Sequence, residues 1–212
     1  MRSDDEDERA LSPEETLRLI ESQRAETERH LGGDPLLFYG SWGLAWLIGF
    51  GAFFLRFGLS GHQYLPISAG LAMTILFVSL SLALVVTSYA GWKQSSQVRG
   101  VSQARGTMYG LSWFFGFFAL GLIGGHFGKL LPEAEASLLW SCLSVFVVSI
   151  LFMAGAAVWN EPPMFFVGVW VAAVNMVGVA AGPGWHALLV SVLVGGGFIV
   201  FGTVLRFRLG KA

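Results

Sequence analysis

The sequence predicts an all-α membrane protein in which an N-terminal cytoplasmic helix precedes six transmembrane helices. Across 212 residues the chain is 54% hydrophobic and only 13% charged, with a mean hydropathy of +0.64. This balance is too apolar for an ordinary soluble domain. Six apolar runs have the length that a spanning helix requires, and none has a charged residue in its central part. In lipid such a run must be helical, because its backbone groups have to bond internally.

Short stretches rich in glycine, proline or charge separate the six runs. They divide the chain into a cytoplasmic acidic tail with a capped, charged helix (1–34), a six-helix transmembrane domain (35–206) and a cytoplasmic tail (207–212). The predicted spans are Leu36–Leu55, Leu65–Tyr89, Thr107–Gly125, Ser137–Trp159, Pro163–Ala181 and Trp185–Leu205.

The segment before the first span has two parts. Met1–Arg9 holds five acidic residues and no apolar periodicity, so we expect a disordered tail. Ser12-Pro13-Glu14-Glu15 is a capping box, which predicts a helix from there to about residue 31. Leu17 and Ile20 give this helix only a narrow apolar edge. Two interpretations stay open, a solvated helix beside the membrane and a helix that docks a cytoplasmic protein partner through residues 12–31.

Lys and Arg predict the orientation of the chain. Close to the spans, nine basic residues flank the side that carries both termini, whereas only Arg56 and Lys129 flank the other side. The positive-inside rule therefore predicts cytoplasmic N- and C-termini in a bacterial cytoplasmic (inner) membrane. The formal net charge of -1 and the scattered basic residues give no reason to expect nucleic-acid binding.

The spans carry weak internal similarity. The segment Pro35–Trp42 is similar to Pro163–Trp170, because Pro, Phe, Gly and Trp occur at the same positions in both. The pair Tyr39-Gly40 also recurs as Tyr109-Gly110. We therefore predict three tandem helical hairpins around a pseudo-threefold axis along the membrane normal. In the sixth span, Ser191 and Gly195 are four residues apart, and the run Gly195-Gly196-Gly197 has no side chains. Small residues in this pattern let helix backbones approach closely in lipid.

No catalytic constellation is visible in the sequence. It has no Gly-x-Ser-x-Gly elbow, no His-Glu-x-x-His motif and no phosphate-cradling loop. The single cysteine, Cys142, lies within an apolar run, where it is a small packing residue. We therefore predict a protein that is not an enzyme and has no cofactor.

Two sets of side chains are candidates for a binding site. One histidine falls at the outer end of each predicted hairpin, so three imidazoles could converge on the axis and hold Zn or Cu; otherwise they are unconnected interfacial residues. Aromatic residues start the odd-numbered spans, where they could line a cavity for a flat or cationic ligand or anchor the helices at the headgroups. A deep asparagine could bind a ligand or bond to a neighbouring helix. The histidines are His62, His126 and His186, and the others are Tyr39, Trp42, Trp46, Tyr109, Trp113, Trp170 and Asn175.

The stretch from Ser12–Glu15 through Asp34–Trp46 resembles the opening of a group of small, uncharacterised integral membrane proteins of actinobacteria. The resemblance covers about the first quarter of the chain and implies pairing with a winged-helix regulator. The six-helix layout is also similar to the substrate-binding membrane subunits of vitamin importers of the energy-coupling-factor type. The AlaxxxAla docking motif of such subunits is missing, however, since the first span has only Ala45 and Gly49 at that spacing.

Two functions follow as hypotheses. The first is an accessory or sensing subunit in the lipid bilayer that engages a cytoplasmic partner through its N-terminal helix. The alternative is a small-molecule binder or transporter for an apolar or aromatic solute. The alternative requires a cavity walled by the odd-numbered spans, and a solidly packed bundle would remove it. Whether the chain forms a homo-oligomer is left open.

Overall fold

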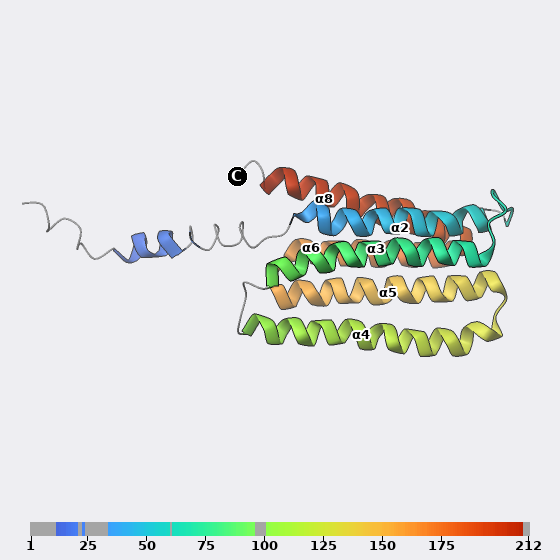
Figure 1. The fold of residues 1–212 in the computed structure, drawn as a ribbon, viewed down its shortest axis with the longest axis horizontal. Helices are drawn as coiled ribbons and strands as arrows, with labels where there is room; N and C mark the ends of the chain where they lie inside the picture. The colour runs from blue at the N-terminus through green and yellow to red at the C-terminus, as the bar shows by residue number, and fades with distance from the viewer. Residues whose placement is uncertain (1–11, 21–22, 24–33, 60, 96–100, 210–212) are drawn as a thin grey trace, which may run out of the picture.

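The computed structural model describes residues 12–20, 23, 34–59, 61–95 and 101–209. Six spans lie side by side in one bundle (Figure 1), and each is long and apolar enough to cross a membrane. The predicted fold class is confirmed, and the chain is a multi-pass membrane protein. The helical elements are α2 (Pro35–Phe57), α3 (Ala69–Ser95), α4 (Val101–Phe127), the 3₁₀ turn η1 (Gly128–Leu130), α5 (Glu133–Trp159), α6 (Pro162–Ala181), α7 (Pro183–Leu189), the π-helical segment η2 (Val190–Gly195) and α8 (Gly196–Leu209).

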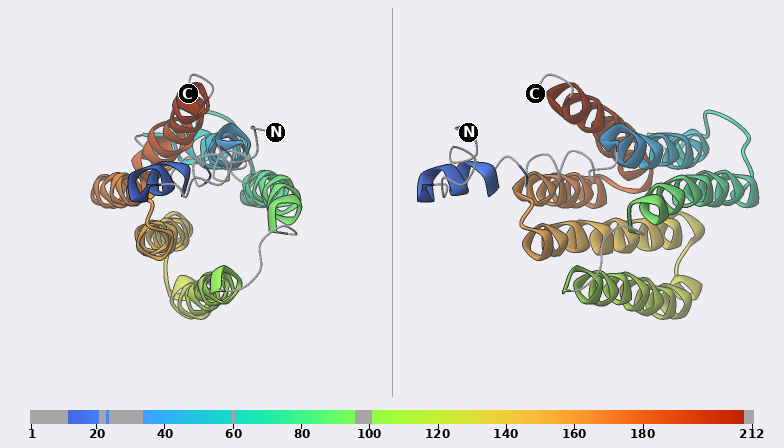
Figure 2. Two further views of the ribbon diagram at one scale, coloured as in Figure 1. Left: turned by 90° about the vertical axis from the view of Figure 1, so that its left-hand side faces the viewer. Right: turned by 60° about the vertical axis from the view of Figure 1, so that its left-hand side comes forward.

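The helices form a ring when they are viewed along the bundle (Figure 2). In this ring α2 packs between α3 and α8, α5 packs between α4 and α6, and α6 continues the wall through α7 and η2. Along their described residues, the consecutive helices α3 and α4 make no extensive contact with each other. We name the two ends of the bundle after residues found there, the Asp34 end at the start of α2 and the Glu133 end at the start of α5.

The two helices on either side of the gap, α3 and α4, are the least packed. Only 11% of the most apolar stretch of each of these helices is buried, against 33 to 39% in the other four spans. Each of the three successive helix pairs forms a hairpin, as predicted, but the ring is closed on one side and open on the other. The pseudo-threefold relation between the hairpins stays a prediction.

The last span differs from the single helix that was predicted, because the π-helical segment η2 interrupts it. A π-helical turn holds one residue more than an α-helical turn, which shifts the side chains and carbonyls around the axis. Two side-chain hydrogen bonds hold the segment in place. The Ser191 hydroxyl donates to the Leu47 carbonyl of α2 at 2.8 Å, and the Trp170 indole of α6 donates to the Leu193 carbonyl at 3.1 Å.

The capping box of the N-terminal segment is confirmed. The Ser12 amide donates to the Glu15 carboxylate at 2.8 Å, and the Glu15 amide donates to the Ser12 hydroxyl at 3.2 Å. Bonds from the backbone and then the side chain of Ser12 lower the pKa of Glu15. Residues 13–20 and 23 are helical, and Leu17 and Ile20 are exposed. The rest of the helix predicted to residue 31 lies outside the described residues.

Candidate functional site

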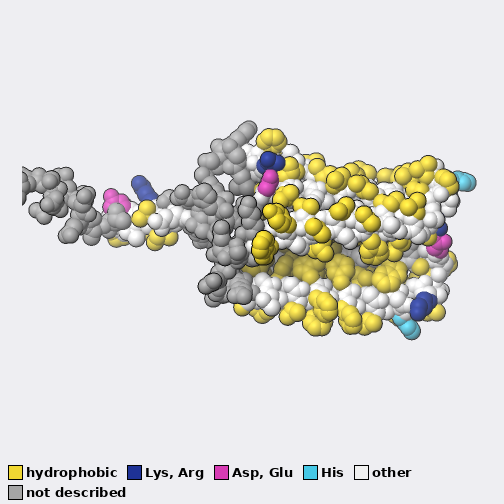
Figure 3. All heavy atoms as spheres, in the orientation of Figure 1, with side chains coloured by type: hydrophobic (Ala, Val, Ile, Leu, Met, Phe, Trp, Pro, Cys, Tyr) yellow, Lys and Arg dark blue, Asp and Glu magenta, His cyan; other side chains and the backbone are white. Residues whose placement is uncertain are grey.

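A cavity of about 2340 Å³ lies inside the ring of helices. Its wall follows α2 from Asp34 to Phe57 and is completed mainly by α3, α4, α5 and α8. Since α2 has 23 residues, a cavity along its whole length extends for about 35 Å. In Figure 3 the surface is hollowed between two ridges, and hydrophobic side chains cover the bottom of the hollow. The cavity exceeds the ~300–1,000 Å³ of a typical small-molecule pocket.

Helical spacing explains why so many aromatic residues share this wall. From Tyr39 to Phe57 those on α2 recur every three or four residues and therefore lie on one face of the helix, as they also do on α4. The aromatic cavity residues of these two helices are Phe38, Tyr39, Trp42, Trp46, Phe50, Phe53 and Phe57 on α2, and Tyr109, Trp113 and Phe117 on α4.

The aromatic side chains of α2 and α4 are joined across the cavity by phenylalanines of α5 and α8. Trp113 meets Phe152 with 6.4 Å between ring centroids, and Phe152 stacks on Phe198 at 5.7 Å. Tyr39 lies edge-on to Phe201 at 4.8 Å. These centroid separations lie in the range at which aromatic pairs attract beyond simple burial. The result is one continuous aromatic wall.

Five of the seven ligand-binding candidates line the cavity, namely Tyr39, Trp42, Trp46, Tyr109 and Trp113. The Tyr109 hydroxyl donates to the Leu151 carbonyl at 2.8 Å, which fixes its ring against α5. The structure places the other two candidates elsewhere. Trp170 is 48% exposed on the outside of the bundle, bonded to η2 as described above. Asn175 is buried among helices.

A polar cluster around Asn175 ties α5, α6 and α7 together. The Asn175 amide donates to the Cys142 carbonyl at 3.1 Å, and its carbonyl oxygen lies 2.8 Å from His186 Nε2. Because that oxygen can only accept, Nε2 carries the proton of the imidazole. His186 Nδ1 faces the Ser141 hydroxyl at 3.4 Å, and Ser141 also lines the cavity.

The three predicted metal-binding histidines do not converge. His186 is only 1% exposed and is bound to Asn175, whereas His62 and His126 are exposed. Among the described residues, no group of three or more His, Cys, Asp or Glu side chains could hold a metal ion. The expectation of a site on a central axis is wrong because η2 and α7 place the His186 ring inside the α5–α6 packing.

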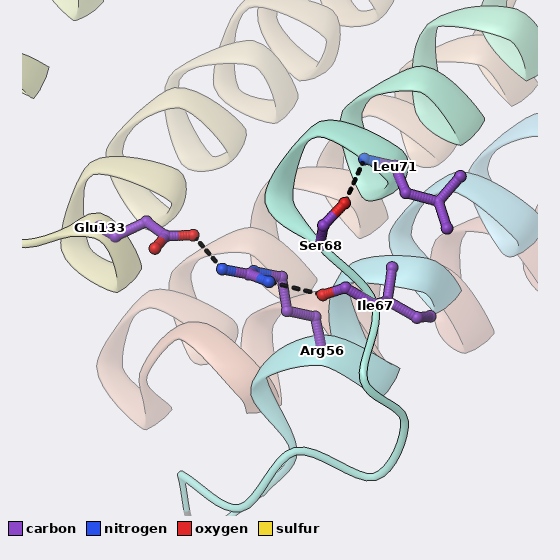
Figure 4. A network of polar contacts seen from close by, with 5 residues as sticks. All are labelled: Arg56, Ile67, Ser68, Leu71 and Glu133. Carbon is purple, nitrogen blue, oxygen red and sulfur yellow. Dashed lines mark hydrogen bonds and ion pairs between the residues drawn. The ribbon is translucent and has the colours of Figure 1, made fainter.

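Ion pairs lie at both ends of the cavity. At the Asp34 end, Arg206 of α8 pairs with Asp34 at 3.3 Å, and both residues line the cavity. At the Glu133 end, Arg56 of α2 points across to Glu133 of α5 and pairs with it (Figure 4).

The Arg56 guanidinium is largely buried, with its side chain 13% exposed. It also donates to the Ile67 carbonyl at 2.5 Å, while its Nε has no hydrogen-bond partner among the described residues. The sequence marked Arg56 only as a flanking charge and gave no signal for its partner, because Glu133 is 77 residues away.

The ring and its cavity define a multi-pass membrane protein with a large internal cavity that is open between two helices. No family model, no curated protein and no solved structure matches the chain. The resemblances noted in the sequence therefore stay predictions, and the cavity has to be interpreted from its own geometry.

Proposed function

We propose that this protein binds an apolar or aromatic molecule inside its helix bundle, as a non-enzymatic membrane binder or transporter. The observation that carries the proposal is the cavity of about 2340 Å³ with its continuous aromatic wall. A large apolar cavity with few polar groups is the usual form of a ligand site. The ionisable side chains that line it are at its ends, so its middle suits an uncharged part of a ligand.

Native mass spectrometry of the full chain, extracted in mild detergent, tests this proposal. We expect a mass excess on the wild-type protein. Trp113→Ala removes the contact of Trp113 with Phe152 in the cavity wall and should reduce the fraction that carries the excess by about tenfold, roughly 1.4 kcal/mol. Trp92→Ala is the control, because Trp92 is 72% exposed and does not line the cavity. A wild-type protein without any mass excess would contradict the proposal.

We also propose the orientation in which the Asp34 end faces the cytoplasm of a bacterial cell and both termini lie there. The support is the distribution of Lys and Arg. Four described basic residues lie at the Asp34 end, namely Lys93 near the end of α3, Arg105 near the start of α4, and Arg206 and Arg208 of α8, whereas Arg56 and Lys129 lie near the Glu133 end. The excess on the Asp34 side agrees with the positive-inside rule.

A second candidate function is that of an accessory subunit that engages a cytoplasmic partner through residues 12–31. The observation in its favour is the capped helix, whose described residues Ser12–Ile20 are all exposed, among them the apolar Leu17 and Ile20. Exposed apolar side chains on a capped helix suit a groove in a partner.

Deletion of residues 1–33 tests the partner hypothesis. The deleted chain should still insert into the membrane, because all six spans begin after residue 34. A partner protein should copurify with the full chain from its own host but not with the deleted chain. The double variant Leu17→Ser, Ile20→Ser should fail to copurify the same protein. Unchanged recovery of that protein would remove this candidate and would leave the cavity proposal intact.

A further inference from the structure

We infer that the cavity takes a phospholipid, which enters sideways from the bilayer between α3 and α4. This inference rests on the proposed function, because it names the ligand class and the route for the same cavity. It is carried by three features, namely the gap between two helices, the ion pair that bridges the Glu133 end and the charged residues at the Asp34 end.

The gap between α3 and α4 supplies the route. Met73, Phe77 and Leu84 of α3 line the cavity and yet are 43%, 58% and 55% exposed, because α4 does not cover them. Figure 2 shows α3 and α4 as separate neighbours in the ring, and Figure 3 shows a hollow between ridges with hydrophobic side chains inside it. In a membrane this side of the ring faces acyl chains, so lipid has direct access to the aromatic wall.

The Glu133 end of the cavity is bridged, which favours the lateral route over entry from that end. The Arg56–Glu133 pair links α2 to α5 across the ring there, whereas the Asp34–Arg206 pair joins the neighbouring helices α2 and α8. A solute entering from the Glu133 end would have to separate the largely buried Arg56 from its partner, which is costly. Among the described cavity-lining residues, a chain entering between α3 and α4 meets apolar side chains and Ser81 on α3, and on α4 it also meets Tyr109, whose hydroxyl is bonded to Leu151.

The charged residues at the Asp34 end point to a phosphate-bearing headgroup. Arg208 lines the cavity there, is exposed and forms no ion pair with another described residue. Glu161 lines the same end. Arginine binds phosphate well, and a carboxylate accepts from an ammonium, so the two suit a zwitterionic headgroup such as phosphatidylethanolamine. The wall is about 35 Å long and so spans the hydrocarbon core of about 30 Å. The acyl chains of one phospholipid cover one leaflet, about half of that core, so a lipid with its headgroup at the Asp34 end would reach the middle of the wall.

The side chains of the wall favour a lipid over a transmembrane helix as the occupant. A helix about 30 Å long and 10 Å across would occupy about 2400 Å³ and could fit by volume. Helices in membranes, however, pack through small residues that let backbones approach. Much of this wall consists of Trp, Tyr and Phe, such as Trp42, Trp46 and Trp113. Such a surface suits flexible acyl chains, which adapt to its shape.

A photoactivatable phospholipid tests the inference on the full chain. The protein is reconstituted into vesicles of phosphatidylethanolamine and phosphatidylglycerol that contain phosphatidylethanolamine with a diazirine in one acyl chain. Labelled peptides are then mapped by mass spectrometry. Labelling near Trp46 and Phe50 reports the cavity, because both line it and are only 5% exposed. Labelling near Val85, which is 66% exposed on α3, is the internal reference for the lipid-facing surface.

Gly121 provides the variant that narrows the route. It lines the cavity on α4, one residue beyond Leu120 around the helix, and an added Cβ there would meet nothing within 4 Å. Gly121→Trp, or Gly121→Leu as the milder form, should lower cavity labelling relative to Val85 by about tenfold. Gly125→Trp is the matched control, since Gly125 is also open, lies one turn further and does not line the cavity.

Arg208→Gln tests the headgroup. It should reduce cavity labelling several-fold, whereas Arg105→Gln, a change of α4 outside the cavity wall, should not. Equal labelling in both would overturn the phosphate contact.

The outcomes separate the inference from the proposed function. Cavity labelling that is equal in wild type, Gly121→Trp and Gly125→Trp would overturn lateral entry and leave a lipid in the cavity. No cavity labelling, with a native mass excess of another small molecule, would overturn the lipid class and leave the proposed function standing. A diazirine-bearing amino acid incorporated at Phe50 tests the other occupant, and photocrosslinks from it between two copies would assign the cavity to a helix of a second copy and overturn the inference.

Discussion

Gly195→Val should be among the most destabilising single substitutions in this protein. Gly195 of η2 faces Gly43 of α2, and a Cβ on Gly195 would lie 2.7 Å from the Leu47 amide nitrogen and 2.9 Å from the Gly43 carbonyl oxygen. All of these atoms belong to backbone, so no side chain can move aside. The two helices would have to separate, and we expect a loss of about 3 kcal/mol in the free energy of unfolding. The contact of Ser191 with the Leu47 carbonyl would weaken as well.

The neighbouring Gly196 gives a matched control for this prediction. A Cβ on Gly196 would meet nothing within 4 Å, although both glycines lose the same backbone freedom when they become valine. SDS-titrated unfolding of the two variants in one detergent, followed by circular dichroism, compares their stabilities. An equal loss in both variants would show that helix propensity, and not the approach of α2 to η2, sets the cost.

These glycines show what could be predicted from the sequence and what could not. Hydrophobic runs and turn residues predicted six spans whose ends agree with the helix ends to within six residues, because the thickness of a bilayer sets the minimum length of such helices. The capping box at Ser12 could be predicted equally well, since its two partners lie three residues apart in the sequence. The four-residue spacing of Ser191 and Gly195 also predicted a close approach of helices, and both residues lie against α2. The sequence did not predict the π-helical segment η2 that contains them, nor that their partners are Gly43 and Leu47.

The same distinction holds for the candidate site. The position of aromatic residues at the start of the odd-numbered spans identified five side chains that share a wall. Their spacing of three or four residues places them on one face of α2 or α4. Nothing in the sequence reported the partners that complete the wall, such as Phe152 and Phe198, which are adjacent to it only through packing. The prediction that the three histidines converge failed for a related reason. Equivalent positions in three hairpins do not bring side chains together when α3 and α4 stay apart and η2 interrupts the last span.

His186→Leu is expected to cause the second large loss of stability. The His186 imidazole is 1% exposed and its Nε2 lies 2.8 Å from the Asn175 carbonyl oxygen. Leucine has similar bulk but no donor, so the buried amide oxygen would be left without its partner. We expect a loss of about 1 to 2 kcal/mol, since hydrogen bonds between membrane helices are worth less than the full cost of an unsatisfied polar group. His126→Leu, at an exposed position, should change stability little.

A double-mutant cycle shows whether this loss comes from the hydrogen bond itself. If the cost of His186→Leu is the unsatisfied Asn175 oxygen, Asn175→Leu in the same chain removes that oxygen, and the double variant should be more stable than the sum of the two single losses predicts. Additive losses in the SDS titration would instead assign the cost to packing of the His186 ring against Phe50, whose centroid is 6.4 Å away. In that case the polar cluster would not be what holds α7 against α5 and α6 at this end of the cavity.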